Sequence, residues 1–280
     1  MKLLRFGNKG AEKPAVLHTD GTIRDVSSLV GDFTPETLSP ALTRILASAD
    51  IGSLPEVPSS VRIGAPLLRT GHFIAIGLNY ADHAAESGLP VPSEPVVFSK
   101  APSCLSGPND DVMLPKGSEK TDWEVELAVI IGERCDYVEE KDALSHVFGY
   151  AVCNDVSERE YQTERGGQWV KGKSAPTFGP LGPWLVTTDE IADPQNLDMF
   201  LDVNGERRQT GNTKTMIFSV AQIVSYLSRF MVLEPGDVIT TGTPPGVGLG
   251  MKPPVYLKAG DEMRLGISGL GEQRQRVVAR

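Results

Sequence analysis

The sequence has few cysteines, no long apolar run and no cluster of basic residues. Its three cysteines, Cys104, Cys135 and Cys153, lie far apart and form no CxxC pair. A disulfide scaffold and a cysteine zinc site are therefore excluded, and a reducing compartment is expected. No apolar stretch approaches the roughly 18 residues that a membrane-spanning helix needs. Arg5 and Gly7 interrupt the N-terminal apolar run, so no signal peptide is predicted and we expect a cytoplasmic protein without a membrane partner.

Positive charge is also scarce. The chain has 280 residues, of which 36 are acidic and 27 are lysine or arginine, so its formal net charge is −9. An acidic surface repels the phosphate backbone of nucleic acids, because both carry negative charge. The sequence therefore favours a small-molecule partner over a nucleic acid.

Glycine and proline are abundant, with 29 and 21 residues, and they indicate many short strands joined by turns. Alternating strand–helix units are missing, so we predict a strand-rich α+β fold rather than a doubly wound or barrel α/β fold. Pro55 and Pro58 mark a linker. Residues 1–65 are predicted to form a small N-terminal α/β domain together with this linker. Residues 66–280 are predicted to form a larger domain. Strands are predicted at Leu3–Phe6, Ala15–Leu17, Ile23–Val26, Phe73–Leu78, Val96–Ser99, Glu124–Ile131, Trp184–Thr187, Met199–Val203 and Asp237–Thr241.

Helices are predicted from their capping residues. Thr34 followed by Pro35 predicts a helix over Thr34–Ser48, since threonine is a good N-cap and proline suits the first turn. Ser157 with Glu160 three residues later matches a capping box and predicts a short helix there. Further helices are predicted at Ala143–Phe148 and Ser219–Met231, and a primed hairpin turn is predicted at Asn204-Gly205.

Two glutamates mark the segment that carries the most chemistry. Side chains alternate between the faces of a strand, so Glu124 and Glu126 share one face of an otherwise apolar strand. Solvated carboxylates on a half-exposed strand are the simplest interpretation, but the same face continues as Ala128 and Ile130, which indicates burial. Two carboxylates about 5 Å apart repel by roughly 3 kcal/mol at an effective dielectric constant of about 20. Either one is protonated or a cation lies between them, and an oxygen-only site would select Mg²⁺ or Mn²⁺.

A third carboxylate follows a second apolar run. Asp155 comes after residues 149–153, so it lies at the end of a predicted strand, where it could point into the same site. The alternative is a turn residue before the helix predicted at Ser157. On that helix Arg159 and Gln162 are three residues apart and share a face.

Of the four histidines, only His83 has a suggestive neighbour. In a short helix His83 and Glu86 would lie on one face, in contact. A carboxylate that holds one imidazole nitrogen leaves the other free to take a proton from water, which predicts a general base. A surface ion pair is the alternative.

Residues 167–174 match GxxxxGK[ST], the pattern of a nucleotide-binding P-loop. We reject nucleotide binding, because a P-loop needs a buried strand before it and a helix after it, and Pro176 prevents that helix. Lys173 remains a candidate for stabilising an anion. Thr243 lies in a glycine-rich turn after the last predicted strand and could offer a hydroxyl and an amide to a carboxylate.

Six motifs, in this order and spacing, resemble the fumarylacetoacetate hydrolase family. They are Asn79-Tyr80 with His83 and Glu86, Glu124-x-Glu126, Asn154-Asp155-Val156-Ser157-x-Arg159, Gly172-Lys173-Ser174, Asn204-Gly205-Glu206 and Thr241-Gly242-Thr243-Pro244. The resemblance covers roughly residues 70–267. It implies a mixed β-sheet roll, a homodimer, and a divalent cofactor that is usually Mg²⁺ or Mn²⁺.

The resemblance also implies roles for single residues. The family's metal ligands correspond to Glu124, Glu126 and Asp155. Its catalytic residues correspond to His83, Glu86 and Lys173. The positions that hold the substrate's carboxylate and oxygens correspond to Arg159, Gln162 and Thr243.

On this basis we predict a metal-dependent hydrolase that cleaves a carbon–carbon bond in a 2,4-dioxo acid, an acylpyruvate-like keto acid. The N-terminal segment resembles that of hydrolases of 2,4-dioxo-3-deoxy sugar acids, such as the rhamnonate or fuconate derivatives, and of members labelled ureidoglycolate lyase. Ureidoglycolate cleavage, oxaloacetate decarboxylation and isomerisation in the same site are the alternatives. A non-catalytic, metal-dependent ligand-binding protein is the alternative of another class, and the intact set of His83, Glu86 and Lys173 disfavours it.

Overall fold

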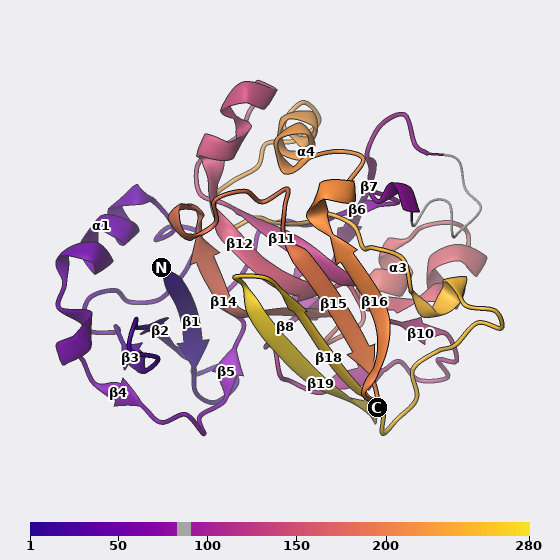
Figure 1. Cartoon of the computed structure of the whole chain (residues 1–280), viewed down its shortest axis with the longest axis horizontal. Coiled ribbons are helices and arrows are strands. Elements are labelled where there is room, and N and C mark those ends of the chain that lie inside the picture. Colours follow the sequence, from indigo (N-terminus) through magenta and orange to yellow (C-terminus); the bar gives the residue numbers. More distant parts are fainter. Residues whose placement is uncertain (83–90) are drawn as a thin grey trace.

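The computed structural model describes residues 1–82 and 91–280. Three β-sheets make up much of this part of the chain, and the helices are few and short (Figure 1). The predicted strand-rich α+β architecture is therefore confirmed. The strands are β1 (Lys2–Phe6), β2 (Lys13–Leu17), β3 (Ile23–Asp25), β4 (Glu56–Val57), β5 (Ile63–Gly64), β6 (Phe73–Gly77), β7 (Val96–Lys100), β8 (Leu105–Ser106), β9 (Val112–Leu114), β10 (Thr121–Asp122), β11 (Val125–Ile131), β12 (Val147–Asn154), β13 (Ser157–Glu158), β14 (Gly179–Thr187), β15 (Asp198–Val203), β16 (Glu206–Asn212), β17 (Val238–Thr240), β18 (Glu262–Ile267) and β19 (Gly271–Ala279).

The largest sheet has 12 strands and holds the core of the molecule. Its main path runs β4-β3-β2-β1-β14-β12-β11-β17-β6-β7, with β5 beside β1 and β8 beside β14. β11 pairs with β12 on one side and β17 on the other, and all its residues are buried. A strand that is covered on both faces needs apolar side chains throughout. Glu126 is the one charged residue of β11, so its burial calls for a functional explanation.

A five-stranded sheet, in the order β16-β15-β18-β19-β9, lies against the first. Gln273 of β19 joins the two sheets, because its Nε2 donates to the carbonyl oxygens of Val152 at 2.8 Å and Gly182 at 2.9 Å. Asn204 and Gly205 connect β15 to β16 with φ angles of 52° and 77°, which confirms the predicted primed turn. β10 and β13 form a separate two-stranded sheet.

The N-terminal strands extend the largest sheet. β1 pairs antiparallel with β14, so β1 to β4 continue the sheet outward on the side marked N in Figure 1. Helix α1 lies in the same part of the molecule (Figure 1). The division into domains at residue 65 stays a prediction.

The helices differ most from the sequence prediction. α1 spans Pro40–Ser48 with Ser39 at its N-cap position, so the predicted start at Thr34 is wrong. A helix from Thr34 would place Pro40 in its interior, where proline lacks an N–H and clashes with the preceding turn. α4 spans Val220–Leu227 and begins with a capping box of Ser219 and Gln222, but it ends before Met231.

The capping box predicted at Ser157 is also wrong. The chain is extended there, since β13 pairs with β10, and a helix cannot begin within a paired strand. The short helix predicted after Ser157 is present as a π-helical turn at Glu160–Glu164, and the short helix α3 spans Val170–Lys173. A 3₁₀ helix at Glu140–His146 replaces the helix predicted at Ala143–Phe148.

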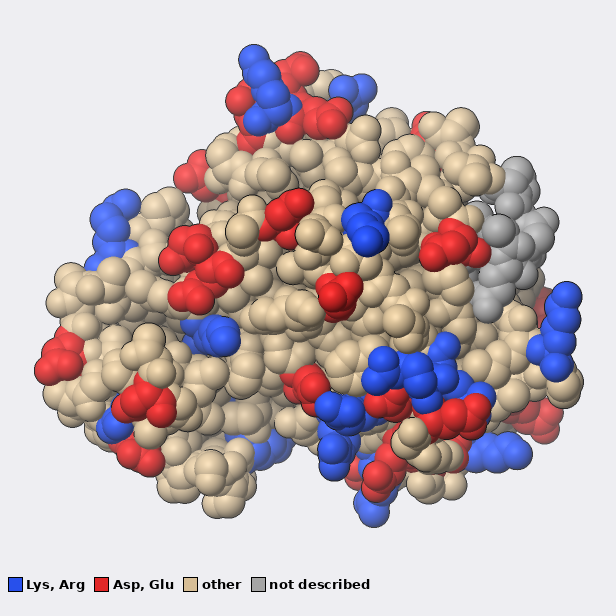
Figure 2. All heavy atoms as spheres, in the orientation of Figure 1, with Lys and Arg blue, Asp and Glu red and all other residues tan. Residues whose placement is uncertain are grey.

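Acidic and basic side chains are interspersed on the face of the molecule shown in Figure 2. Mixed charge of this kind offers no continuous basic surface on that face. No helix in the described part of the chain is long and apolar enough to cross a membrane.

Candidate metal centre

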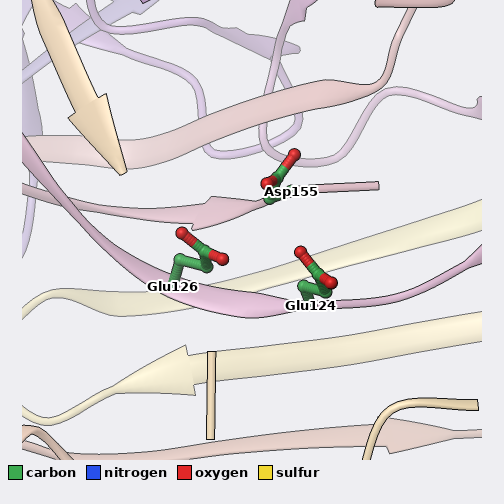
Figure 3. A group of neighbouring side chains, drawn as sticks. All are labelled: Glu124, Glu126 and Asp155. Atoms are coloured by element: carbon green, nitrogen blue, oxygen red, sulfur yellow. The ribbon is translucent and has the colours of Figure 1, made fainter. Parts of the chain in front are cut away.

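Three carboxylates gather beside the middle of the largest sheet (Figure 3). Glu124 immediately precedes β11 and Glu126 is its second residue, so their side chains share a face as strand alternation predicts. Asp155 follows β12, and its amide N–H donates to the carbonyl oxygen of Glu124 at 2.9 Å. One ligand atom from each of the three lies within 4.8 Å of the others, and all three residues are buried. The predicted triad is therefore assembled in space.

Two buried lysines balance part of this negative charge. Lys173 Nζ donates to Glu124 Oε2 at 2.6 Å and to Asp155 Oδ2 at 2.8 Å. Lys100 Nζ donates to Asp155 Oδ1 at 2.5 Å and to the carbonyl oxygen of Lys173 at 2.6 Å. Each lysine is only 1% exposed, so these partners replace its hydration. Asp155 is thus held between two ammonium groups.

Arg159 connects the centre to a fourth buried carboxylate. Its Nη2 lies 2.7 Å from Glu124 Oε1, and its Nε donates to Asp122 Oδ2 at 2.8 Å. Its Nη1 donates to Gln162 Oε1 at 3.0 Å, so the two side chains meet as their spacing suggested. In total, four carboxylates face three cations in this buried region.

The two glutamates of the triad ionise differently, although burial opposes charge on both. For Glu124, the neighbouring Lys173 and Arg159 outweigh burial and hold its pKa below the ordinary value. For Glu126, burial and the negative charges of Asp155 and Glu124 raise its pKa well above the ordinary value. Glu126 is therefore the carboxylate for which a further cation would matter most.

The donor set fits a hard divalent cation. Three carboxylates supply oxygen ligands only, which suits Mg²⁺ or Mn²⁺ better than Zn²⁺. In the described part of the chain no lysine or arginine forms an ion pair with Glu126, and the one hydrogen bond it accepts comes from the amide of Gly242 at 2.8 Å. A buried carboxylate with so few hydrogen-bond partners needs a compensating charge when it is ionised, and a bound cation would provide it. Glu124, Glu126 and Asp155 can together hold such an ion.

Close packing of α3 brings Lys173 into the site. A Cβ at Gly172 would lie 2.4 Å from the carbonyl oxygen of Glu158 and 2.6 Å from the amide nitrogen of Gln162. Only glycine allows α3 to approach the preceding turn this closely. After Lys173 the helix ends and the chain leads into β14, so the helix that a P-loop requires after its lysine is not formed. The Gly-Lys-Ser sequence is explained by this packing.

Thr243 lies at the site but has little hydrogen-bonding capacity to spare. Its hydroxyl donates to the carbonyl oxygen of Val125 at 2.9 Å and accepts from Gln209 Nε2 at 2.8 Å. The hydroxyl proton is therefore engaged within the protein, and what remains for a ligand is a lone pair. The expected hydroxyl donation to a substrate carboxylate would require this bond to break.

A pocket of about 500 Å³ adjoins the carboxylate triad. Its polar end contains Glu124, Glu126, Arg159, Gln162, Lys173 and Thr243. The rest of its lining is mostly apolar and includes Phe98, Trp169, Val247, Leu249, Met251 and Pro254. Asp155 accepts a hydrogen bond from Lys173 and is not among the lining residues. His83 and Glu86, the predicted general base and its partner, lie outside the described residues.

Two residues of the site were missed by sequence reasoning. Lys100 is the last residue of β7, on the same face as Phe98, and this alternation was the signal that could have identified it. Asp122 is fully buried and gave no signal, because apart from the adjacent Trp123 N–H its partners, Arg159, Gly248 and Leu249, are distant in sequence.

The fold and the triad define a class of protein. Residues 72–278 match the family model described as fumarylacetoacetate (FAA) hydrolase C-terminal, and the chain belongs to this family. A relative from Burkholderia multivorans, named as a hydrolase by inference only, is 62% identical over 276 residues, which is 98% of each chain.

Solved structures agree with this assignment. The fumarylacetoacetate hydrolase of Exiguobacterium antarcticum is 40% identical, with a TM-score of 0.89 and 100% of both chains covered. The maleylpyruvate hydrolase of Sphingobium sp. SYK-6, in complex with manganese(II) and pyruvate, is 32% identical with a TM-score of 0.84, and covers 100% of this chain and 99% of its own. The 2-hydroxyhepta-2,4-diene-1,7-dioate isomerase of Mycobacterium marinum is 31% identical with a TM-score of 0.80 and the same coverage. Hydrolases and isomerases of this kind therefore share the fold of this chain.

Proposed function

We propose that the protein is a hydrolase that depends on Mg²⁺ or Mn²⁺ and cleaves a carbon–carbon bond in an acylpyruvate-like 2,4-dioxo acid. The observation that carries the proposal is a buried triad of carboxylates, two of which, Glu124 and Glu126, line a pocket of about 500 Å³ together with Lys173. In the proposed reaction water adds to the 4-carbonyl carbon and the bond between the third and fourth carbons breaks. The products are a carboxylic acid and pyruvate.

The residues of the polar end have separate proposed roles. A divalent cation on the triad supplies Lewis-acid stabilisation of negative charge. Lys173 donates two hydrogen bonds to Glu124 and Asp155, which leaves its third N–H for a substrate oxygen on which negative charge develops. Arg159 has donors left beyond its bonds to protein groups and, with Gln162, is proposed to bind the substrate's carboxylate.

The proposed general base rests on the sequence. His83, oriented by Glu86, would take the proton from the attacking water. Replacing His83 with alanine is expected to slow hydrolysis by about 10²- to 10⁴-fold, the usual contribution of a positioned base. The same change should leave the affinity for metal unchanged.

The apolar lining favours some acyl groups over others. Among 2,4-dioxo-3-deoxy sugar acids, the rhamnonate and fuconate derivatives end in a methyl group, which suits apolar side chains better than a terminal hydroxyl does. These derivatives are therefore the sugar acids that we propose. Isomerisation is a second candidate, favoured by the likeness to the Mycobacterium marinum isomerase.

Product analysis with and without metal tests the proposal. Protein treated with EDTA is incubated with acetylpyruvate before and after addition of Mn²⁺ or Mg²⁺, and NMR identifies the products. Acetate and pyruvate in equal amounts, formed only after metal is added, are expected. Full activity of the EDTA-treated protein would contradict the metal dependence, and isomerised rather than cleaved substrate would favour the second candidate. The homodimer stays a prediction, and light scattering on the purified protein tests it.

A further inference from the structure

We propose that the far end of the pocket selects an uncharged acyl group with an apolar terminus. This inference rests on the proposed function and deepens it, because it specifies the group attached to the 4-carbonyl of the substrate. Two apolar walls and the distribution of cations around the pocket carry it.

The first wall is aromatic and is built into the largest sheet. Phe98 of β7 lies opposite Ala75 of β6, so it is on the same face as Gly77. The ring centroids of Phe98 and Trp169 are 5.1 Å apart, with the planes tilted by 59°. A Cβ at Gly77 would come within 2.6 Å of Trp169 Cζ3, so the glycine provides the space that the indole fills. Packing against Phe98 and Gly77 therefore holds Trp169 in the lining of the pocket.

The same wall reaches the reacting end of the pocket. Lys173 Nζ lies 5.0 Å from the centroid of the Phe98 ring, and Trp169 packs against the same ring. A substrate oxygen bound by Lys173 would therefore place the adjoining acyl carbons along the two rings. Apolar carbons gain free energy there because they leave water for an aromatic surface.

The second wall is the loop that follows β17. Val247, Leu249 and Met251 line the pocket from this loop. Asp122 fixes its backbone, because Oδ1 accepts the Gly248 N–H at 2.7 Å and Oδ2 accepts the Leu249 N–H at 3.0 Å. Asp122 is fully buried and also accepts a hydrogen bond from Arg159, so it connects the loop to the polar end of the pocket. These hydrogen bonds hold the backbone of the loop at the pocket, where Val247 is buried and Leu249 is 44% exposed.

The cations near the pocket do not favour a second carboxylate. Among the described residues that line it, Arg159 and Lys173 are both ion-paired with Glu124, and their remaining donors are those proposed above to bind the substrate's own carboxylate and the oxygen of its 4-carbonyl. The third cation, Lys252, is exposed to solvent. A carboxylate at the far end of a substrate would lose its hydration against apolar side chains, and among the described lining residues Lys252 is the one cation left to pair with it.

Two substrates of equal length test the selection. Butanoylpyruvate and succinylpyruvate differ only in ending with a methyl group or a carboxylate. We expect kcat/KM to be about 100-fold higher for butanoylpyruvate, because the site does not replace the lost hydration of the carboxylate. We also expect butanoylpyruvate to exceed acetylpyruvate by about tenfold, because two further methylenes are buried.

Two variants show which residues are responsible. Trp169→Ala should lower kcat/KM for butanoylpyruvate by about tenfold, mainly through KM, and change acetylpyruvate by less than about threefold. Trp169→Phe should restore part of the loss. Tyr137→Ala, which removes a 73% exposed aromatic outside the pocket, is the matched control and should change neither. Lys252→Met tests whether this lining lysine pairs with the terminal carboxylate of succinylpyruvate.

The outcomes separate this inference from the proposed function. Equal or better cleavage of succinylpyruvate, lost in Lys252→Met, would show that the pocket accepts an anionic acyl group and would overturn the inference while leaving the hydrolase intact. Equal losses for acetylpyruvate and butanoylpyruvate in Trp169→Ala would overturn the role of the aromatic wall. Failure to cleave any acylpyruvate with metal present would overturn the proposed function and this inference with it.

Discussion

Two clusters of charged side chains, one partly buried and one buried, balance charge in different ways. The first, which we term the junction cluster, lies where β1 and β2 meet the segment before β9, and consists of Arg5, Glu12, Asp32, Arg62 and Asp110. The second surrounds the metal centre, and consists of Lys100, Asp122, Glu124, Glu126, Asp155, Arg159 and Lys173. Both contain one more carboxylate than cations.

In the junction cluster every carboxylate has an arginine. Arg5 binds Asp32 through two hydrogen bonds of 2.7 and 2.9 Å, and Arg62 binds Asp110 through two of 2.7 Å. Arg62 also donates to Glu12 at 2.9 Å. Although burial opposes ionisation, the hydrogen bonds from Arg62 lower the pKa of both Glu12 and Asp110.

In the metal centre one carboxylate is left over. Lys100, Lys173 and Arg159 form ion pairs with Asp155, Glu124 and Asp122, and none forms one with Glu126. Burial and two negative neighbours raise the pKa of Glu126, whereas the junction carboxylates shift the other way. The difference supports the proposal that the three carboxylates bind a cation, whereas each junction carboxylate already has an arginine partner.

Removing a cation from the metal centre should have the largest effect. Lys100→Met leaves Asp155 Oδ1 and the Lys173 carbonyl without their donor, and we expect the free energy of unfolding to fall by about 3–5 kcal/mol. Urea unfolding in EDTA measures this. Lys171→Met, on the exposed side of α3, is the matched control and should change stability by less than about 0.5 kcal/mol. A loss below about 1 kcal/mol for Lys100→Met would show that the centre does not depend on this lysine.

Removing the unpaired carboxylate should weaken metal binding instead. Glu126→Gln deletes a ligand without stranding a cation, so Mn²⁺ affinity should fall by about 100-fold or more while the fold persists. Titration followed by electron paramagnetic resonance measures free Mn²⁺. The same substitution in the junction cluster, Glu12→Gln, should leave Mn²⁺ affinity unchanged. Wild-type affinity in Glu126→Gln would remove Glu126 from the ligand set.

Breaking the junction cluster should affect stability and leave metal binding alone. Arg62→Met strands Asp110 and Glu12, and we expect a loss of about 2 kcal/mol in the free energy of unfolding. The effect is smaller than for Lys100 because Arg62 is partly exposed and water can replace it. A change in Mn²⁺ affinity in this variant would mean that the two clusters are coupled.

The smallest effect is a pH dependence of opposite sign in the two clusters. Because the pKa of Glu126 is raised in the fold, its protonated form stabilises the metal-free protein at pH values below the ordinary carboxyl pKa. This contribution to the free energy of unfolding is lost as pH rises through the raised pKa. The lowered pKa values of Glu12 and Asp110 contribute stability above the ordinary carboxyl range, and it is lost as pH falls.

Unfolding of wild type and Glu126→Gln in EDTA across this pH range isolates the first contribution. With rising pH, wild type should lose stability relative to the variant by up to about 1.4 kcal/mol per pH unit. Saturating Mn²⁺ should remove the wild-type loss, because it binds the ionised form. Parallel pH profiles in EDTA would show that Glu126 titrates normally.

Local patterns in the sequence were sufficient for several features. Strand alternation places Glu124 and Glu126 on one face, Asn204-Gly205 requires a primed turn, and Ser219 caps α4. Each depends on residues a few positions apart, whose geometry the backbone restricts directly. The same local rules failed at Thr34 and around Ser157. Ser39-Pro40 supplies a second start signal for α1, and pairing with a strand distant in the sequence overrides the capping pattern at Ser157.

The remaining features were decided by the tertiary structure. The contact between Asp155 and Glu124 follows from the pairing of β11 with β12, and the burial of Lys100 follows from the packing of α3 against β7. The number of cations around each carboxylate also depends on strands far apart in the chain. Among residues 1–82 and 91–280 it leaves Glu126 without an ion pair, whereas each junction carboxylate has an arginine. The sequence by itself determined which residue types and faces were available for a metal site, because side-chain chemistry and strand alternation are local. Only the folded sheets decided which charges meet, because an ion pair depends on distance in space and not on separation along the chain.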